Sequence, residues 1–142
     1  MRISAKGEYA IKAILDLSLQ PPRELIPIQD IAARQAIPQR YLEQVLLALK
    51  RAGLLTSKRG SAGGYHLTRG PEEITVGAVL RAVEGESAPF ESLSRRRDGY
   101  DLAELWSEIG DAVSRVVDGL TFGELAARAR ERRAAVRPMY HI

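Results

Sequence analysis

A short run of polar side chains after Pro38 has the chemistry to bind the edges of DNA bases. The run consists of Gln39, Arg40, Glu43 and Gln44. Arginine can donate two hydrogen bonds to guanine, glutamine can pair with adenine, and glutamate can accept from cytosine. The apolar neighbours Leu42, Val45 and Leu46 recur at helical spacing, which leaves the polar run on the other face of a helix. Polar residues on an amphipathic helix are often only solvated, so this run alone does not establish DNA binding.

A cationic, glycine-rich stretch further along the chain offers a second contact for a nucleic acid. Lys58 and Arg59 precede the glycine-rich residues 60–64, and the flanking segments 54–59 and 65–68 have the composition of two strands. Such a hairpin brings the backbone close to a phosphate and lets one long cation enter the minor groove, and Arg59 is the candidate. A nucleotide-binding phosphate loop does not fit, because no GK[ST] follows and the next element is a strand.

Further candidate DNA contacts surround these two features. Lys6 lies near the start of the chain, and Lys50 with Arg51 follows the polar run. These cations are placed for phosphate contacts, which set affinity more than specificity. We include Ser61 and Gly63 of the glycine-rich turn in the predicted DNA-binding set.

The sequence predicts neither an enzyme nor a bound cofactor. Ser57 and Ser61 have no partner histidine other than His66, and no nucleophile, base and orienting group occur in a recognisable arrangement. The absence of cysteine excludes disulfides, thiolate metal sites and cysteine nucleophiles. His66 and His141 are far apart in sequence, and a strand histidine is more often structural or close to DNA than a metal ligand.

Three predicted helices position the polar run. They span residues 4–19, residues 28–35 and the segment from Pro38 to Gly53, with Pro38 expected at the first helical position and Gly53 as the stop. A brief extended piece is expected at residues 25–28. The short link between the last two helices predicts a helix-turn-helix, and the hairpin adds a wing. The fold class is therefore mainly α with a small β-hairpin wing.

The chain after residue 100 carries an apolar stripe that the winged helix cannot cover alone. The stripe consists of Leu102, Leu105, Trp106, Ile109, Val113, Val116, Val117 and Leu120. Its spacing of three and four residues over about five turns predicts a long helix that needs a partner helix. Thr121 with Glu124 predicts a capping box for a final helix. The expected division is a winged helix-turn-helix domain at 1–70, a linker helix and loop at 71–100, and a dimerisation helix with the C-terminal helix and tail at 101–142.

The charge of the chain is divided unevenly between its two halves. Residues 1–70 contain 11 Lys and Arg against 5 Asp and Glu, a formal charge of +6, whereas residues 71–142 contain 10 against 13, a charge of −3. Clustered cations gain affinity for a polyanion by releasing counterions, so the first half is the expected DNA-binding half. No export signal or membrane-length apolar run occurs, and we expect a cytoplasmic protein without a membrane partner.

Several segments of the sequence closely resemble the Rrf2 family of bacterial transcription regulators. They are MRISAKGEYAIKAILDL, IQDIAARQAIPQRYLEQVLLALKRAGLL, SKRGSAGGYHLTRGPEEITVGAVLRAVEG, ELW and LTFGEL. The pairing of YLEQ with RGxxGGY is specific, and the resemblance covers residues 1–86 and, more loosely, 102–125. It implies a winged-helix homodimer held by the long C-terminal helix on a partly palindromic operator in double-stranded DNA. It also implies that Tyr41, Glu43 and Gln44 lie on or beside the reading helix and that Arg59 enters the minor groove.

The chain departs from the cluster-binding members of that family. Those relatives have three cysteines in the loop before the long helix, whereas this chain has FESLSRRRDGY at residues 90–100, so no iron-sulfur cluster of the family's type is expected. Glu8 stands where some relatives have an acidic ligand, and without a thiolate we interpret it as a surface or salt-bridge residue.

The expected function is a repressor whose signal, a small molecule or a protein, acts on the loop at residues 85–99. The alternative is a protein-interaction module of the same fold that has lost operator recognition. The presence of Arg59, Glu43 and Gln44 argues against that alternative.

Overall fold

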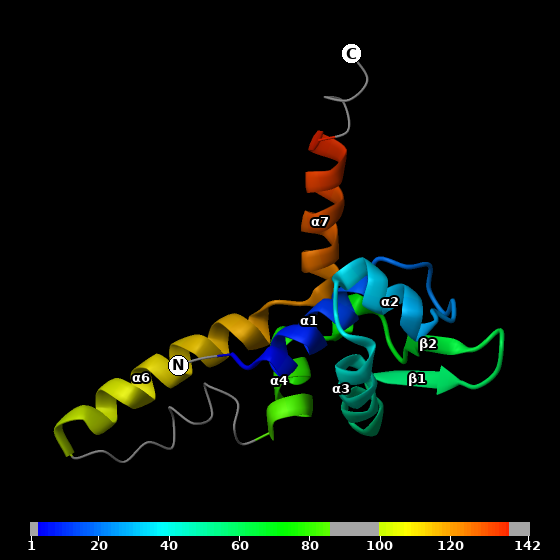
Figure 1. Ribbon diagram of the computed structural model, residues 1–142. Coiled ribbons are helices and arrows are strands. Elements are labelled where there is room, and N and C mark those ends of the chain that lie inside the picture. The colour runs from blue at the N-terminus through cyan, green and yellow to red at the C-terminus, as the bar shows by residue number, and fades with distance from the viewer. Residues whose placement is uncertain (1–2, 86–99, 137–142) are drawn as a thin grey trace.

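The computed structural model describes residues 3–85 and 100–136 (Figure 1). Its elements in chain order are α1 (Ala5–Ser18), α2 (Ile28–Gln35), α3 (Gln39–Arg51), β1 (Leu55–Lys58), β2 (Gly64–Leu67), the 3-10 turn η1 (Pro71–Glu73), α4 (Val76–Glu84), α6 (Tyr100–Gly119) and α7 (Phe122–Val136). The expectation of a mainly helical chain with a small hairpin is confirmed. Most of the predicted polar loop at 85–99, and the tail with His141, lie outside the described residues. None of the described helices is long and apolar enough to cross a membrane.

The first three helices form a compact group because each buries one apolar face. In α1 the Ser4 side chain accepts a hydrogen bond from the Gly7 amide at 3.1 Å and caps the helix. Helix α2 has the predicted bounds. Helix α3 begins at Gln39, so the expectation that Pro38 is the first helical residue was wrong by one position. Pro38 has an extended ψ of 124° and precedes the helix, while its carbonyl accepts from the Leu42 amide at 3.1 Å.

The hairpin is a two-stranded antiparallel sheet that pairs Leu55 with Leu67 and Lys58 with Gly64. A side chain at position 63 would overlap the Lys58 carbonyl, so the turn closes only around a glycine. The expected extended piece before α2 pairs with the hairpin, because Ile26 and Tyr65 exchange two backbone hydrogen bonds of 2.9 Å. The base of the wing is thereby fixed to the helical group.

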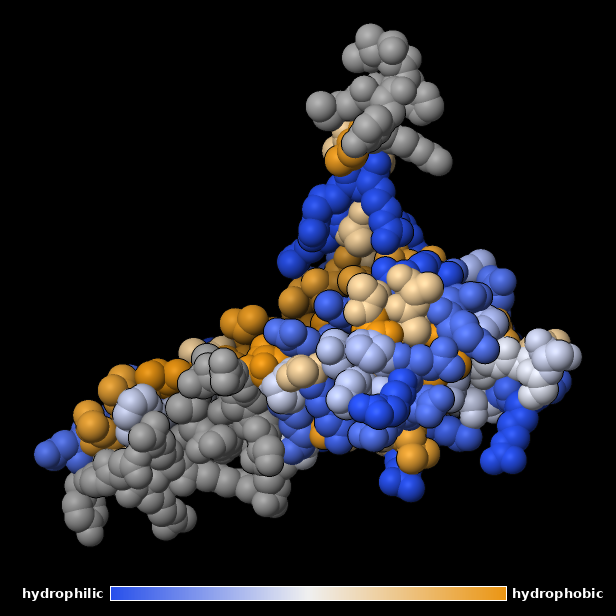
Figure 2. All heavy atoms as spheres, viewed as in Figure 1, coloured by the Kyte–Doolittle hydropathy of each residue, from blue (hydrophilic) through white to orange (hydrophobic). Residues whose placement is uncertain are grey.

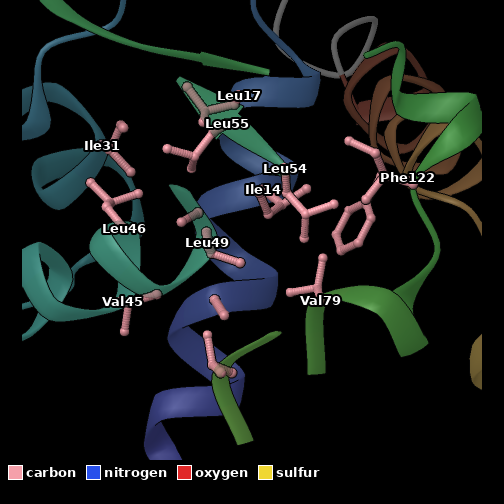
Figure 3. Close-up of a cluster of buried hydrophobic side chains, with 14 of the residues drawn as sticks. Ile14, Leu17, Ile31, Val45, Leu46, Leu49, Leu54, Leu55, Val79 and Phe122 are labelled. Atoms are coloured by element: carbon pink, nitrogen blue, oxygen red, sulfur yellow. The ribbon is translucent and has the colours of Figure 1, made fainter. Parts of the chain in front are cut away.

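The core brings together residues from both ends of the described chain (Figure 3). Ile14 of α1 and Leu46 and Leu49 of α3 are fully buried, and Val79 of α4 and Phe122 of α7 are buried in the same cluster. Full burial of each such side chain contributes about 1.5 to 3 kcal/mol to stability. The helix-turn-helix is thus supported from behind by α4 and the first turn of α7.

The last two helices leave this body in different directions (Figure 1). The link between them is held to the start of α4 by a backbone bridge, where the Val76 amide donates to the Leu120 carbonyl at 3.0 Å. The Arg81 guanidinium of α4 donates to both carboxylate oxygens of Asp118 of α6, at 2.7 and 2.9 Å. A Cβ atom at Gly77 would overlap that carboxylate, so α6 crosses α4 over a residue without a side chain. The Thr121 hydroxyl accepts from the Glu124 amide at 3.2 Å, which confirms the Thr121 half of the predicted capping box of α7.

Candidate nucleic-acid interface

The first turns of α3 separate polar and apolar side chains onto opposite faces. Leu42, Val45 and Leu46 are buried. The exposed residues of the polar run are Gln39, Arg40, Glu43 and Gln44, together with Tyr41, which is 47% exposed. This edge presents donors and acceptors to solvent on a helix that is fixed by its other face.

Two of the exposed residues restrain each other. The Arg40 guanidinium carbon lies 5.3 Å from the centroid of the Tyr41 ring, and its Nη2 donates to the tyrosine hydroxyl at 3.4 Å. A cation over an aromatic face at this distance is attracted by the ring quadrupole. Because the two side chains already restrict each other, less side-chain conformational entropy is lost when they bind a partner.

The tip of the wing is also exposed. Lys58, Arg59 and Ser61 are exposed, and Gly63 is half-buried in the turn. The Lys50 ammonium near the end of α3 donates to the Ser57 hydroxyl of β1 at 2.7 Å. This bond joins the end of α3 to the wing, so Lys50 has a positioning contact besides its predicted phosphate contact. From the sequence, Ser57 was considered only as a nucleophile, and its hydrogen bond with Lys50 was not predicted.

An ion pair between a buried aspartate and a partly exposed arginine fixes α2 against α1. The Asp16 side chain is 2% exposed and accepts from Arg34 Nε and Nη2, each at 2.9 Å, and from Gln35 Nε2 at 3.2 Å. The hydrogen bonds from Arg34 to this carboxylate raise the pKa of the guanidinium above its ordinary value. Because α3 follows α2 after a short turn, this pair helps to set the orientation of the polar edge. The available sequence signal was an aspartate between Leu15 and Leu17 on an apolar face.

The structure brings Lys6 close to the start of α3, which its sequence position did not indicate. Lys6 and Tyr9 of α1 share one hollow with Tyr41 and Gln44 of α3. Tyr9 is half-buried and was not among the predicted contacts. Tyr9 follows Lys6 by three residues and shares its helical face, and this spacing could have indicated Tyr9 as a candidate contact.

The predicted stripe of α6 divides into two parts. Toward the end of the helix, Val113, Val117 and Leu120 pack against the core of their own chain. Trp106 and Ile109 are half-buried. The exposed members are Leu102 at 47%, Leu105 at 43% and Val116 at 65%. Figure 2 shows the apolar surface that runs along α6, away from the body of the molecule.

Comparison with known proteins identifies the family. The family model Rrf2, described as an iron-dependent transcriptional regulator, matches residues 3–128. The chain belongs to the Rrf2 family. IscR of Aliivibrio salmonicida, an HTH-type transcriptional regulator, is 37% identical over 131 residues, which cover 88% of this chain and 77% of the relative. CymR of Bacillus subtilis, also an HTH-type regulator, is 36% identical over 127 residues, or 89% of this chain and 91% of CymR.

Solved structures of such Rrf2 regulators have the same fold. CymR, the global cysteine regulator of B. subtilis, superposes with a TM-score of 0.78 at 32% identity, over 90% of this chain and 98% of that one. IscR of T. potens superposes with a TM-score of 0.79 at 32% identity, over 93% of this chain and 90% of that one. The winged-helix fold is thereby confirmed, and this Rrf2 chain is a DNA-binding transcriptional regulator and not an enzyme.

The donor set of this Rrf2 chain does not fit an iron-sulfur cluster. The chain contains no cysteine, so no thiolate can ligate iron. Within residues 3–85 and 100–136, no group of three His, Asp or Glu side chains is arranged to hold a metal ion. The exposed carboxylate of Glu8 on α1 has no thiolate beside it.

Proposed function

We propose that the chain is a cytoplasmic, sequence-specific repressor that binds a partly palindromic operator as a homodimer, without an iron-sulfur cluster. One observation carries the proposal: the polar edge of α3 and the tip of the wing are both exposed, and the bond between Lys50 and Ser57 joins the end of α3 to strand β1 of the same wing. In a helix-turn-helix the second helix enters the major groove and reads base edges with its first turns. Gln39, Arg40, Glu43 and Gln44 are the residues at that place.

The wing supplies the second part of the proposed contact. Arg59 enters the adjacent minor groove, and Lys58, Ser61 and Gly63 approach the backbone. Lys6 and Arg51 contact phosphates, while Tyr41 lies beside the reading residues. The proposed division of labour follows the elements: residues 1–70 read DNA, 71–100 connect, and 101–142 pair the two copies.

The homodimer is proposed on the apolar side chains of α6. Leu102, Leu105 and Val116 remain exposed in the single chain, and a patch of this kind marks a protein interface. Pairing through α6 would present two reading edges, which explains why a palindromic operator is expected. A small-molecule or protein effector acting between α4 and α6 would then alter the relative placement of the two edges.

Selection of genomic fragments by the purified protein tests this function. We expect a small set of promoter fragments that share an inverted repeat, bound with higher affinity than unrelated duplex DNA. The double variant Arg59→Ala with Glu43→Ala should not enrich that set. Enrichment of no sequence by the unmodified protein would leave the chain as a protein-interaction module of the same fold.

A further inference from the structure

A hollow of about 430 Å³ lies between the beginning of α1 and the beginning of α3. Each helix lines it with residues spaced three and four apart, which share one helical face. The lining residues are Ala5, Lys6 and Tyr9 of α1, and Tyr41, Gln44 and Val45 of α3. Val45 is 1% exposed and belongs to the buried core, while the polar side chains reach the surface. The hollow is therefore built on a fixed base with hydrogen-bonding groups around it.

The chemistry of the lining favours an anion. Its polar groups are an ammonium, two phenol hydroxyls and a carboxamide, and each of them can donate a hydrogen bond. None of these six lining residues carries a carboxylate. A larger groove of about 1000 Å³ beside α7 differs in this respect, since Glu24, Glu72 and Glu124 line it together with its arginines. The positive guanidinium of Arg40, held against the Tyr41 ring, adds to the attraction at the smaller site.

We propose that this hollow receives one phosphate of the DNA backbone, held by Lys6 and by the hydroxyl of Tyr9. The proposal rests on the proposed function, because it takes the orientation of α3 in the major groove as given. The hollow adjoins Tyr41 and Gln44, so a helix inserted in the groove brings the flanking strand to it. Tyr9 then becomes a DNA-binding residue of α1, and the phosphate fixes how far along the groove α3 lies.

Equilibrium binding of the full chain to operator DNA and to an unrelated duplex, over a range of salt concentrations, tests the proposal. Lys6→Gln should lower both affinities in parallel and make the slope of log K against log salt less negative by about 0.9 for each phosphate that is no longer neutralised. Tyr9→Phe should lower both affinities by about two- to tenfold and leave the slope unchanged. Lys12→Gln, the same charge change at an exposed position of α1 outside the hollow, is the control.

Neutral methylphosphonate groups, placed one at a time along the operator, locate the phosphate directly. One position should weaken binding by the unmodified protein and have no further effect on Lys6→Gln. The proposal is overturned if both variants bind like Lys12→Gln while the unmodified protein still selects its operator. It is also overturned if the variants lose discrimination between base pairs but keep their affinity for the unrelated duplex, or if inorganic phosphate binds tightly to the protein without DNA. Failure of the unmodified protein to bind any DNA would instead contradict the proposed function.

Discussion

The α1–α3 group with its hairpin and the long helix α6 leave opposite kinds of surface uncovered. In α3 the apolar Leu42 and Leu46 are buried and the exposed side chains of the first turns are mainly polar, whereas α6 exposes Leu105 and Val116. A polar edge suits a hydrated, charged partner, and an apolar stripe suits another protein surface. In the proposed homodimer, the first region presents the binding edge and the second is covered by a second copy of the chain.

The ion pairs of the two regions differ in how deeply the aspartate is buried. The side chain of Asp16 is 2% exposed and that of Asp118 is 42% exposed, whereas their partners Arg34 and Arg81 are similarly exposed, at 43% and 38%. A buried charge without its partner is costly, whereas an exposed pair is screened by water. The pair between α1 and α2 is thus expected to contribute more to stability than the pair between α4 and α6.

The largest expected effect comes from introducing charge into the stripe of α6. Leu105→Glu combined with Val116→Glu should yield monomers and lower operator affinity by about 100- to 10,000-fold, because two linked half-sites bind with a high effective concentration. Sedimentation and operator titration measure the two effects. Ser107→Glu adds charge to the exposed surface of the same helix outside the stripe and serves as control. A double variant that stays dimeric would remove the proposed interface from this face.

Replacing the aspartate by asparagine in each ion pair compares how much the two pairs contribute to stability. Asp16→Asn should lower the free energy of unfolding by about 1.5 to 3 kcal/mol, because the buried side chain loses its charge-assisted hydrogen bonds from Arg34 and Gln35. Asp118→Asn should cost less than about 1 kcal/mol. Urea denaturation at one fixed protein concentration measures both. Equal losses of unfolding free energy would show that burial of Asp16 does not make its ion pair more stabilising.

Loss of the wing cation should affect recognition and leave stability unchanged. Arg59→Ala is expected to weaken operator binding by about 1 to 3 kcal/mol and to relax the preference for the sequence at the minor groove. Arg132→Ala, an exposed arginine of α7, is the matched control. Operator titrations with single base-pair changes measure the preference. Binding identical to that of the control would exclude Arg59 from the contact.

The smallest expected effect is on acid stability. Hydrogen bonds from Arg81 hold the pKa of Asp118 below its ordinary value in the folded chain. A group with a lowered folded pKa stabilises the fold above its unfolded pKa of about 4, and this contribution is lost as the pH falls through the folded value. The difference between the unmodified protein and Asp118→Asn, present at neutral pH, should therefore shrink in acid. A difference that grows as the pH falls would have the wrong sign.

The regular part of the fold was predictable because its signals are local. The bounds of α2 follow from the period of Ile28, Ile31 and Ala32, and the hairpin follows from its glycines and strand-forming neighbours. The cap at Thr121 needed only the spacing to Glu124. Features of this kind depend on residues a few positions apart.

Contacts between distant parts of the chain were not predictable in the same way. The pairing of Asp16 with Arg34 and the bond from Lys50 to Ser57 depend on how helices and strands pack. The hollow that adds Tyr9 to the candidate contacts exists only because α1 and α3 begin close together. A single sequence gives the chemistry of each residue but not which residues three-dimensional packing will bring face to face.

Gly77 gives the crossing of α4 and α6 a consequence for the operator. Any side chain there must displace the Asp118 carboxylate, which is the end of a flexible side chain, and the bond to Arg81 that helps to fix the angle of α6 is then weakened. From Asp118 back to Leu102 the helix rises about 24 Å, at about 1.5 Å per residue. A shift the width of a methyl group near one end is therefore amplified at the other. In the proposed dimer, a side chain at position 77 that lets α6 tilt would therefore change the distance between the two reading edges.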